Sequence, residues 1–124
     1  MKVRVPQCYG FCFGVKRAME LVLQLANQEN RGKIFTDGPL IHNPQALQVL
    51  RDRGVIPLSE AAEEKIEGTI VIRSHGISPH RLEELKKTGA KIFDATCPKV
   101  KQVQSIIAQY AQKGFYIIII GEPD

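Results

Sequence analysis

The sequence lacks several features that would assign its 124 residues to a simple class. It contains no tryptophan, and aromatic residues make up only 6% of the chain, so few rings are available for stacking nucleobases. Its longest apolar run is the six residues 115–120, far short of the ~20 that a bilayer-spanning helix needs. No apolar stretch follows the positively charged N-terminus, so no secretory signal is visible. These absences argue against a single-strand nucleic-acid binder, a membrane protein and a secreted protein.

Cysteine and net charge are also low. Cys8, Cys12 and Cys97 are the only three cysteines, and an odd number without a signal peptide argues against a disulfide framework. It favours a reducing compartment, the cytoplasm, in which thiols stay free, bind metal or act in catalysis. The net charge of +4 comes from 17 basic and 13 acidic residues spread along the chain. This mild excess suits an anionic small molecule.

What remains is an ordinary globular composition with a repeating pattern of elements. Apolar segments predict strands at residues 2–6, 33–36, 69–73, 91–94 and 115–120. Amphipathic segments, each preceded by glycine or opened by a capping residue or proline, predict helices at residues 15–30, 44–53, 59–65, 79–87 and 98–112. The alternation predicts an α/β fold, a parallel sheet with helices on both faces, in a single domain of residues 1–124.

Chemistry-bearing residues follow the first four predicted strands. The turns are G-F-C-F-G, G-P-L-I-H-N-P, S-H-G and D-A-T-C-P, in that order. Ligands of open parallel sheets bind beyond the carboxyl ends of the strands. We therefore expect Cys12, His42, His75 and Cys97 to meet at one edge of the sheet. The convergence of four turns, rather than any single motif, predicts a functional site there.

The two cysteines in these turns are candidate metal ligands or nucleophiles. Cys12 lies between Gly10 and Gly14 at the start of a predicted helix, and Cys97 directly precedes a proline that opens another predicted helix. The partial positive charge of a helix N-terminus favours the thiolate form that both roles need. The alternative is that each cysteine is a small buried apolar residue. Cys8 has no glycine flanks and is interpreted as structural.

The two histidines are candidate anion ligands. His42 and His75 stand in I-H-N-P and S-H-G, where an imidazole can hydrogen-bond to phosphate oxygens or to a hydroxyl group. The alternative for each is a capping or loop histidine. His80 lies beside Arg81 on a predicted helix and is interpreted as solvated. The glycines before the first helix form G-x-x-x-G, which is not the dinucleotide-binding fingerprint.

Two cysteines do not complete a metal site, since structural zinc takes four ligands and iron–sulfur clusters usually take four thiolates. Either other segments supply the remaining ligands or the cysteines have another role. One alternative is a small module that uses its thiolates for zinc binding or redox sensing. A radical enzyme with a Cys-x-x-x-Cys cluster motif at Cys8 and Cys12 is disfavoured, because no third cysteine follows two residues later.

Four segments together resemble one enzyme family. G-F-C-F-G-V-K-R-A, G-P-L-I-H-N-P-Q, R-S-H-G and D-A-T-C-P-K-V, in this order and at these separations, closely resemble the 4-hydroxy-3-methylbut-2-enyl diphosphate reductases. These are the iron–sulfur enzymes of the last step of the non-mevalonate isoprenoid pathway. The resemblance covers the whole chain, and the set of four motifs is highly specific.

The resemblance implies a fold, a cofactor and roles for four residues. It implies three similar α/β domains around a central [4Fe–4S] cluster, with this chain as the first domain. Cys12 and Cys97 would be two of the three thiolates that hold the cluster, and His42 and His75 would bind the allylic alcohol diphosphate. The products would be isopentenyl and dimethylallyl diphosphates, and the electron donor a flavodoxin or ferredoxin.

The end of the chain departs from the family pattern. In the family, a segment like G-E-P-D is followed by His-Pro-Glu, which supplies a third substrate histidine and the proton-donating glutamate. The third cluster cysteine and a Ser/Asn group that binds diphosphate lie later still. We therefore expect this chain to be truncated after Asp124, to contain no catalytic residue of its own and to be inactive alone. Glu122 does not match the proton donor, and Cys8 matches no family ligand.

Overall fold

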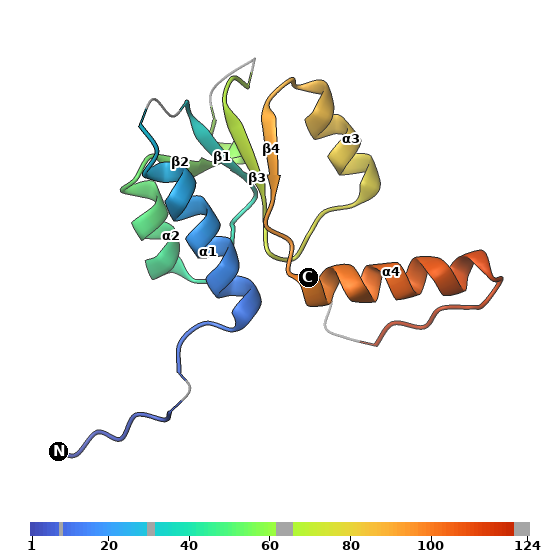
Figure 1. Cartoon of the computed structure of the whole chain (residues 1–124), viewed down its shortest axis with the longest axis horizontal. Coiled ribbons are helices and arrows are strands. Elements are labelled where there is room, and N and C mark those ends of the chain that lie inside the picture. The colour runs from blue at the N-terminus through green and yellow to red at the C-terminus, as the bar shows by residue number, and fades with distance from the viewer. Residues whose placement is uncertain (8, 30–31, 62–65, 121–124) are drawn as a thin grey trace.

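A four-stranded parallel sheet forms the centre of the molecule (Figure 1). The computed structural model describes residues 1–7, 9–29, 32–61 and 66–120. The strand order is β2-β1-β3-β4, and each neighbouring pair is parallel. The strands are β1 (Ile34–Asp37), β2 (Val55–Pro57), β3 (Thr69–Ile72) and β4 (Lys91–Asp94). The predicted α/β class is confirmed. β2 was not predicted, because its three residues are too few to show a pattern.

Helices connect the strands, and their starts follow from local sequence. They are α1 (Phe13–Ala26), α2 (Pro44–Arg51), α3 (Pro79–Lys87) and α4 (Pro98–Gln112). Asn43 caps α2 by accepting a hydrogen bond from the Ala46 amide at 2.9 Å, and Ser78 caps α3 in the same way. A capping side chain followed by proline is a strong start signal. Both predicted starts are confirmed.

Helices cover both faces of the sheet, as predicted. Side chains of successive strand residues point to opposite faces, so Ile34 and Val71 pack with α1 and α2. Phe35 and Ile70 pack on the other face, with α3 and the 3₁₀ turn Leu58–Glu60. Figure 1 shows α1 and α2 on one side of the sheet and α3 on the other. The resulting core is apolar on both sides of β1 and β3.

Helix α4 leaves this core. None of its residues is buried, and Figure 1 shows it projecting from the end of β4 away from the sheet. Val103, Ile106 and Tyr110 on α4 are exposed. After Gly114 the chain turns back, and the Phe115 amide donates a hydrogen bond to the Tyr110 carbonyl oxygen.

The predicted strands at residues 2–6 and 115–120 are wrong. Both segments are exposed and pair with no strand in the described part of the chain. Residues 2–6 extend away from the sheet ahead of α1, and residues 115–120 run back along α4 from its outer end (Figure 1). A strand needs a sheet edge within reach, and neither segment reaches one here.

Two predicted helices differ at their boundaries. α1 ends at Ala26 rather than at residue 30, and residue 30 lies outside the described residues. The helix predicted at residues 59–65 begins instead as the 3₁₀ turn Leu58–Glu60, followed by an extended Ala61. Residues 62–65, Cys8 and Glu122 also lie outside the described residues.

Candidate functional site

Four turns carry the predicted site residues, and the structure brings them together at the carboxyl edge of the sheet. The turns after β1, β3 and β4 lead to His42, His75 and Cys97, as predicted. Cys12 does not follow a strand, because residues 2–6 form none, and it lies instead at the N-cap of α1. The first turn of α1 reaches the same edge by packing against Cys97.

His42 and His75 are neighbours. Their ring centroids are 4.8 Å apart, and the ring planes are inclined by 50°. Both residues are exposed, whereas Leu40 and Ile41, just before His42, are fully buried in the core. The loop that carries His42 is therefore anchored by apolar burial while its imidazole faces outward. Two exposed imidazoles at this spacing can hydrogen-bond to a single anion.

Cys12 and Cys97 are both free thiols at helix N-caps. Cys12 is exposed and Cys97 is half-buried. A Cβ added at Gly14, two residues after Cys12, would lie 2.5 Å from Cys97 Sγ and 2.8 Å from Cys97 Cβ. The absence of a side chain at Gly14 therefore lets the first turn of α1 pack directly on Cys97.

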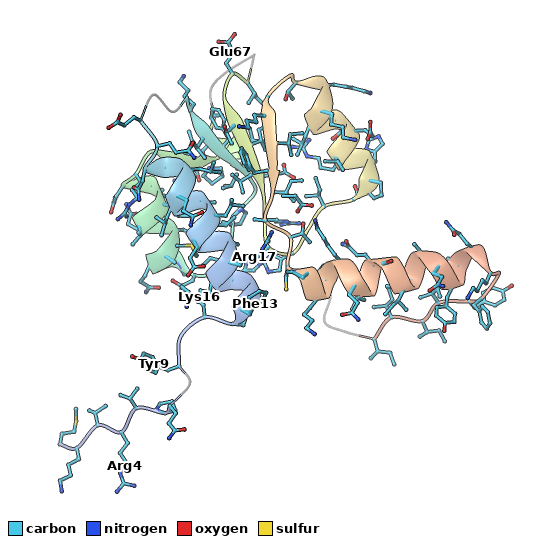
Figure 2. All side chains as sticks on the ribbon, in the orientation of Figure 1. Arg4, Tyr9, Phe13, Lys16, Arg17 and Glu67 are labelled. Atoms are coloured by element: carbon cyan, nitrogen blue, oxygen red, sulfur yellow. The ribbon has the colours of Figure 1, made fainter. Side chains whose placement is uncertain are left out.

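Main-chain hydrogen bonds join the turns to one another. The Cys97 amide donates to the Ser74 carbonyl oxygen at 2.9 Å, and the Ser74 hydroxyl donates to the Leu40 carbonyl oxygen at 3.2 Å. Arg17 of α1 donates through Nη1 to the Thr96 carbonyl oxygen at 3.4 Å. Figure 2 shows Arg17 on the side of α1 that faces the start of α4. The network links residues up to 79 positions apart in the sequence.

Asp94 fixes the turn that leads to Cys97. Its Oδ1 accepts a hydrogen bond from the Thr96 amide at 2.8 Å, and its Oδ2 lies 2.6 Å from Lys101 Nζ. Burial disfavours the ionised carboxyl, but the hydrogen bonds from Lys101 and Thr96 outweigh it and lower the pKa of Asp94. The carboxylate is thus charged at neutral pH and holds the D-A-T-C turn against the first turn of α4.

Sequence reasoning missed the supporting roles of Gly14, Arg17, Ser74 and Asp94. Only Asp94 had a local signal, since an Asp followed two residues later by an accessible amide is typical of an Asx turn. The other contacts join residues far apart in the chain. His80, predicted to be solvated, has a side chain that is 86% exposed, beside Glu84.

The two thiols alone are too few donors for a complete metal site. In the ranges that the structure describes, no three His, Cys, Asp or Glu side chains lie close enough together to hold a metal ion. Two thiol donors on packed helix N-termini suit an iron–sulfur cluster, and such a cluster would take its remaining ligand from other residues. The donor set fits the group that the resemblance implies but does not complete it.

A cavity of about 600 Å³ lies beside His75. It is also lined by Arg73, by residues 76–78, by Pro79 at the start of α3, and by Gln104, Ile107 and Ala108 of α4. The cavity therefore has a cationic side chain, Arg73, and an imidazole, His75, in one opening.

No helix in the described ranges combines the length and the apolar character needed to cross a membrane.

Comparison with known proteins gives consistent matches. The family model described as LytB protein matches residues 3–124. A relative from Aquifex aeolicus named 4-hydroxy-3-methylbut-2-enyl diphosphate reductase is 47% identical over 91% of this chain. A second, from Caldanaerobacter subterraneus and of the same name, is 41% identical over 98% of the chain.

Two solved structures share the fold. One is described as (E)-4-hydroxy-3-methyl-but-2-enyl diphosphate reductase, the terminal enzyme of the non-mevalonate pathway, with a TM-score of 0.78 and 47% identity over 91% of this chain. The other, an E-1-hydroxy-2-methyl-but-2-enyl-4-diphosphate reductase from Plasmodium falciparum, has a TM-score of 0.76 and 29% identity over 86% of this chain. The chain spans only 38% and 43% of the two relatives, and 40% and 33% of the two structures.

Proposed function

Because this chain belongs to the LytB protein family, we propose that it forms part of an enzyme that reduces 4-hydroxy-3-methylbut-2-enyl diphosphate. The products are isopentenyl and dimethylallyl diphosphates, and the hydroxyl group leaves as water after uptake of two electrons and two protons. The observation that supports the proposal is that the turns carrying His42, His75 and Cys97 contact one another and the first turn of α1, which Cys12 caps. The chain is the first α/β domain of the enzyme, and its packed core extends from α1 to Ala95.

The two cysteines hold the cofactor in this proposal. Cys12 and Cys97 supply two thiolates to a [4Fe–4S] cluster, with the third thiolate from outside residues 1–124. When bound, the cluster would supply the electrons for the reduction, with a flavodoxin or ferredoxin in the cytoplasm as their source. Because Gly14 has no side chain, the first turn of α1, which Cys12 caps, can pack directly against Cys97.

The two histidines bind the substrate. The adjacent imidazoles of His42 and His75 hydrogen-bond to diphosphate oxygens, and the neighbouring guanidinium of Arg73 adds positive charge to the same opening. Hydrogen bonds to a charged partner are stronger than those between neutral groups, so this arrangement orients the anion before reduction. Residues 1–124 contain no proton donor for the reaction.

The test uses the complete gene product that carries this sequence, reconstituted anaerobically with iron and sulfide. We expect reduction of 4-hydroxy-3-methylbut-2-enyl diphosphate by a chemical or flavodoxin donor, with both products detected. Cys12→Ser and Cys97→Ser should each lose cluster absorbance and activity together. Cys8→Ser is the matched control and should keep both. A gene product that binds zinc instead, or that holds a cluster but does not turn over the substrate, would contradict the proposal.

A further inference from the structure

We propose that Ser74 is a positioning residue that sets the relative placement of His42 and His75 and so determines how tightly the site holds its substrate. This inference rests on the proposed function. Ser74 lies directly before His75 and is only 4% exposed. Because it is almost completely buried, its effect must act through the turns that it joins.

The hydrogen bonds of Ser74 reach two other turns of the site. Its hydroxyl and its amide both donate to the Leu40 carbonyl oxygen, at 3.2 and 3.3 Å. Its own carbonyl oxygen accepts from the Cys97 amide at 2.9 Å. One residue thus connects the loop that carries His42, the turn that carries His75 and the turn that carries Cys97.

The Ser74 hydroxyl restrains the loop that carries His42 at its Leu40 carbonyl oxygen, in addition to the cap that Asn43 forms directly after the histidine. The loop begins at Gly38, whose φ of +78° is accessible mainly to glycine. Leu40 and Ile41 anchor it by burial, but burial of apolar side chains is non-directional. The two donors of Ser74 on one carbonyl oxygen supply the direction. Because Leu40 is two residues before His42 and Ser74 is one before His75, this contact sets the spacing of the two imidazoles.

Ser74 contacts the cysteine turn through its main chain, but it contacts the histidine loop partly through its side chain. The bond to Cys97 uses the main chain of Ser74, which any residue keeps. Half of the link to Leu40 uses the hydroxyl, which alanine removes. Ser74→Ala should therefore loosen the histidine pair while leaving the cysteine turns in place. This division distinguishes a positioning role from general support of the fold.

The experiment measures KM, kcat and cluster absorbance for Ser74→Ala in the complete, reconstituted gene product. Loss of one buried hydrogen bond should raise KM by about three- to tenfold, with kcat changed less than about twofold. Iron content and cluster absorbance should be unchanged. Ser74→Thr keeps the hydroxyl and should restore KM. In ¹⁵N-histidine spectra, the imidazole signals of His42 and His75 should shift in Ser74→Ala and return in Ser74→Thr.

Thr88→Ala is the matched control. It removes a hydroxyl that donates to the Leu85 carbonyl oxygen at 2.7 Å, at the far end of α3, and should leave KM and the imidazole signals unchanged. An unchanged KM and unmoved signals in Ser74→Ala would overturn the inference, as would equal effects in Thr88→Ala. If the wild-type protein does not reduce the substrate, the proposed function fails. The imidazole signals then still decide the positioning role, because a shift supports it and no shift removes it.

Discussion

Individual residues at the carboxyl edge of the sheet divide into those that face outward and those that hold them. His42 and His75 are exposed, whereas Ser74 and Thr96 beside them are buried. Exposed polar residues on loops held by buried neighbours are typical of binding sites. The two groups should respond differently to substitution, since one contacts the ligand and the other sets geometry.

Replacing a site histidine should weaken substrate turnover and spare the cofactor. His42→Ala or His75→Ala removes one of two adjacent imidazoles, and loss of a hydrogen bond to a charged ligand corresponds to about a tenfold or larger fall in kcat/KM. Steady-state kinetics and iron analysis of the complete gene product check this. His80→Ala is the control, because His80 is exposed beside Glu84. Normal kinetics in a His42 or His75 variant would remove that residue from the site.

Gly14 should tolerate no side chain. A methyl group there would meet Cys97 Sγ and Cβ at less than 3 Å. The short side chain of Cys97 cannot easily move aside, because the Cys97 amide donates a hydrogen bond to the Ser74 carbonyl oxygen. Gly14→Ala should therefore displace the thiol and lower cluster content by more than half, although alanine is the better helix former by about 1 kcal/mol. Iron content measures the effect. Gly89→Ala has open space at its Cβ but a φ of +76°, so it controls for backbone strain alone and should retain the cluster.

Asp94 should make the turn before Cys97 sensitive to acid. Because its pKa is lowered in the folded protein, its charge stabilises the fold above the unfolded carboxyl pKa of about 3.9, and this contribution disappears as pH falls through the folded pKa. Asp94→Asn should lower stability at pH 7 by roughly 1 kcal/mol, a small value because the side chain is 40% exposed. Melting temperatures measured from pH 7 downward should differ by a constant amount until the pH nears the unfolded pKa of about 3.9, and the gap should then narrow as the pH falls further. Curves that stay parallel below that pH would contradict this assignment.

At the scale of elements, helix starts are the most locally determined features. Asn43 caps α2 directly after His42, and its Oδ1 accepts from the Ala46 amide. The cap therefore both starts the helix and ends the loop that carries the histidine.

Asn43→Ala should destabilise the protein by about 1 kcal/mol, the usual cost of losing such a cap. Asn43→Ser keeps an acceptor oxygen and should recover most of the loss, which thermal unfolding of both variants would measure. Ser78→Ala at the start of α3 is a matched comparison, because Ser78 caps α3 by accepting a hydrogen bond from the Arg81 amide at 3.2 Å. Equal stability of Asn43→Ala and wild type would show that the cap contributes nothing.

Features set by interactions between residues close in the sequence could be predicted from it, whereas features set by contacts between distant residues could not. The starts of α2 and α3 depend on a capping residue and a proline, so they were predicted correctly. The segments 2–6 and 115–120 have strand-like composition, but pairing depends on a sheet edge that no local pattern reveals. Likewise, the sheet topology indicated that four turns would meet, whereas the contact of Gly14 with Cys97 depends on packing between residues 83 positions apart.

At the scale of the whole molecule, large apolar side chains are exposed on the N-terminal segment ahead of α1 and on an arm formed by α4 and residues 115–120. Tyr116, Ile118 and Ile120 are at least 85% exposed, and Val103 and Ile106 on α4 are exposed as well. Exposed apolar patches of this kind mark interaction surfaces or aggregation hazards. A segment as β-prone as F-Y-I-I-I-I is a typical hazard.

The 124-residue chain expressed alone should therefore self-associate. Size-exclusion chromatography with light scattering should show oligomers at about 100 μM, and Ile118→Lys with Ile120→Lys should shift the protein toward monomer. Val49→Lys, an exposed apolar position on α2 outside this arm, is the control and should not change the distribution. A monomeric wild-type chain at that concentration would contradict the expectation.

The attachment of α4 also has a mechanical consequence. The helix has 15 residues and is therefore about 22 Å long, and it is held at its first turn, where Cys97 bonds to Ser74 and Lys101 pairs with Asp94. A shift of about 2 Å at the outer end would correspond to a rotation of only about 5° about the turn that carries Cys97. A partner that packed on the outer end of α4 would therefore act through the helix on a cysteine about two nanometres away.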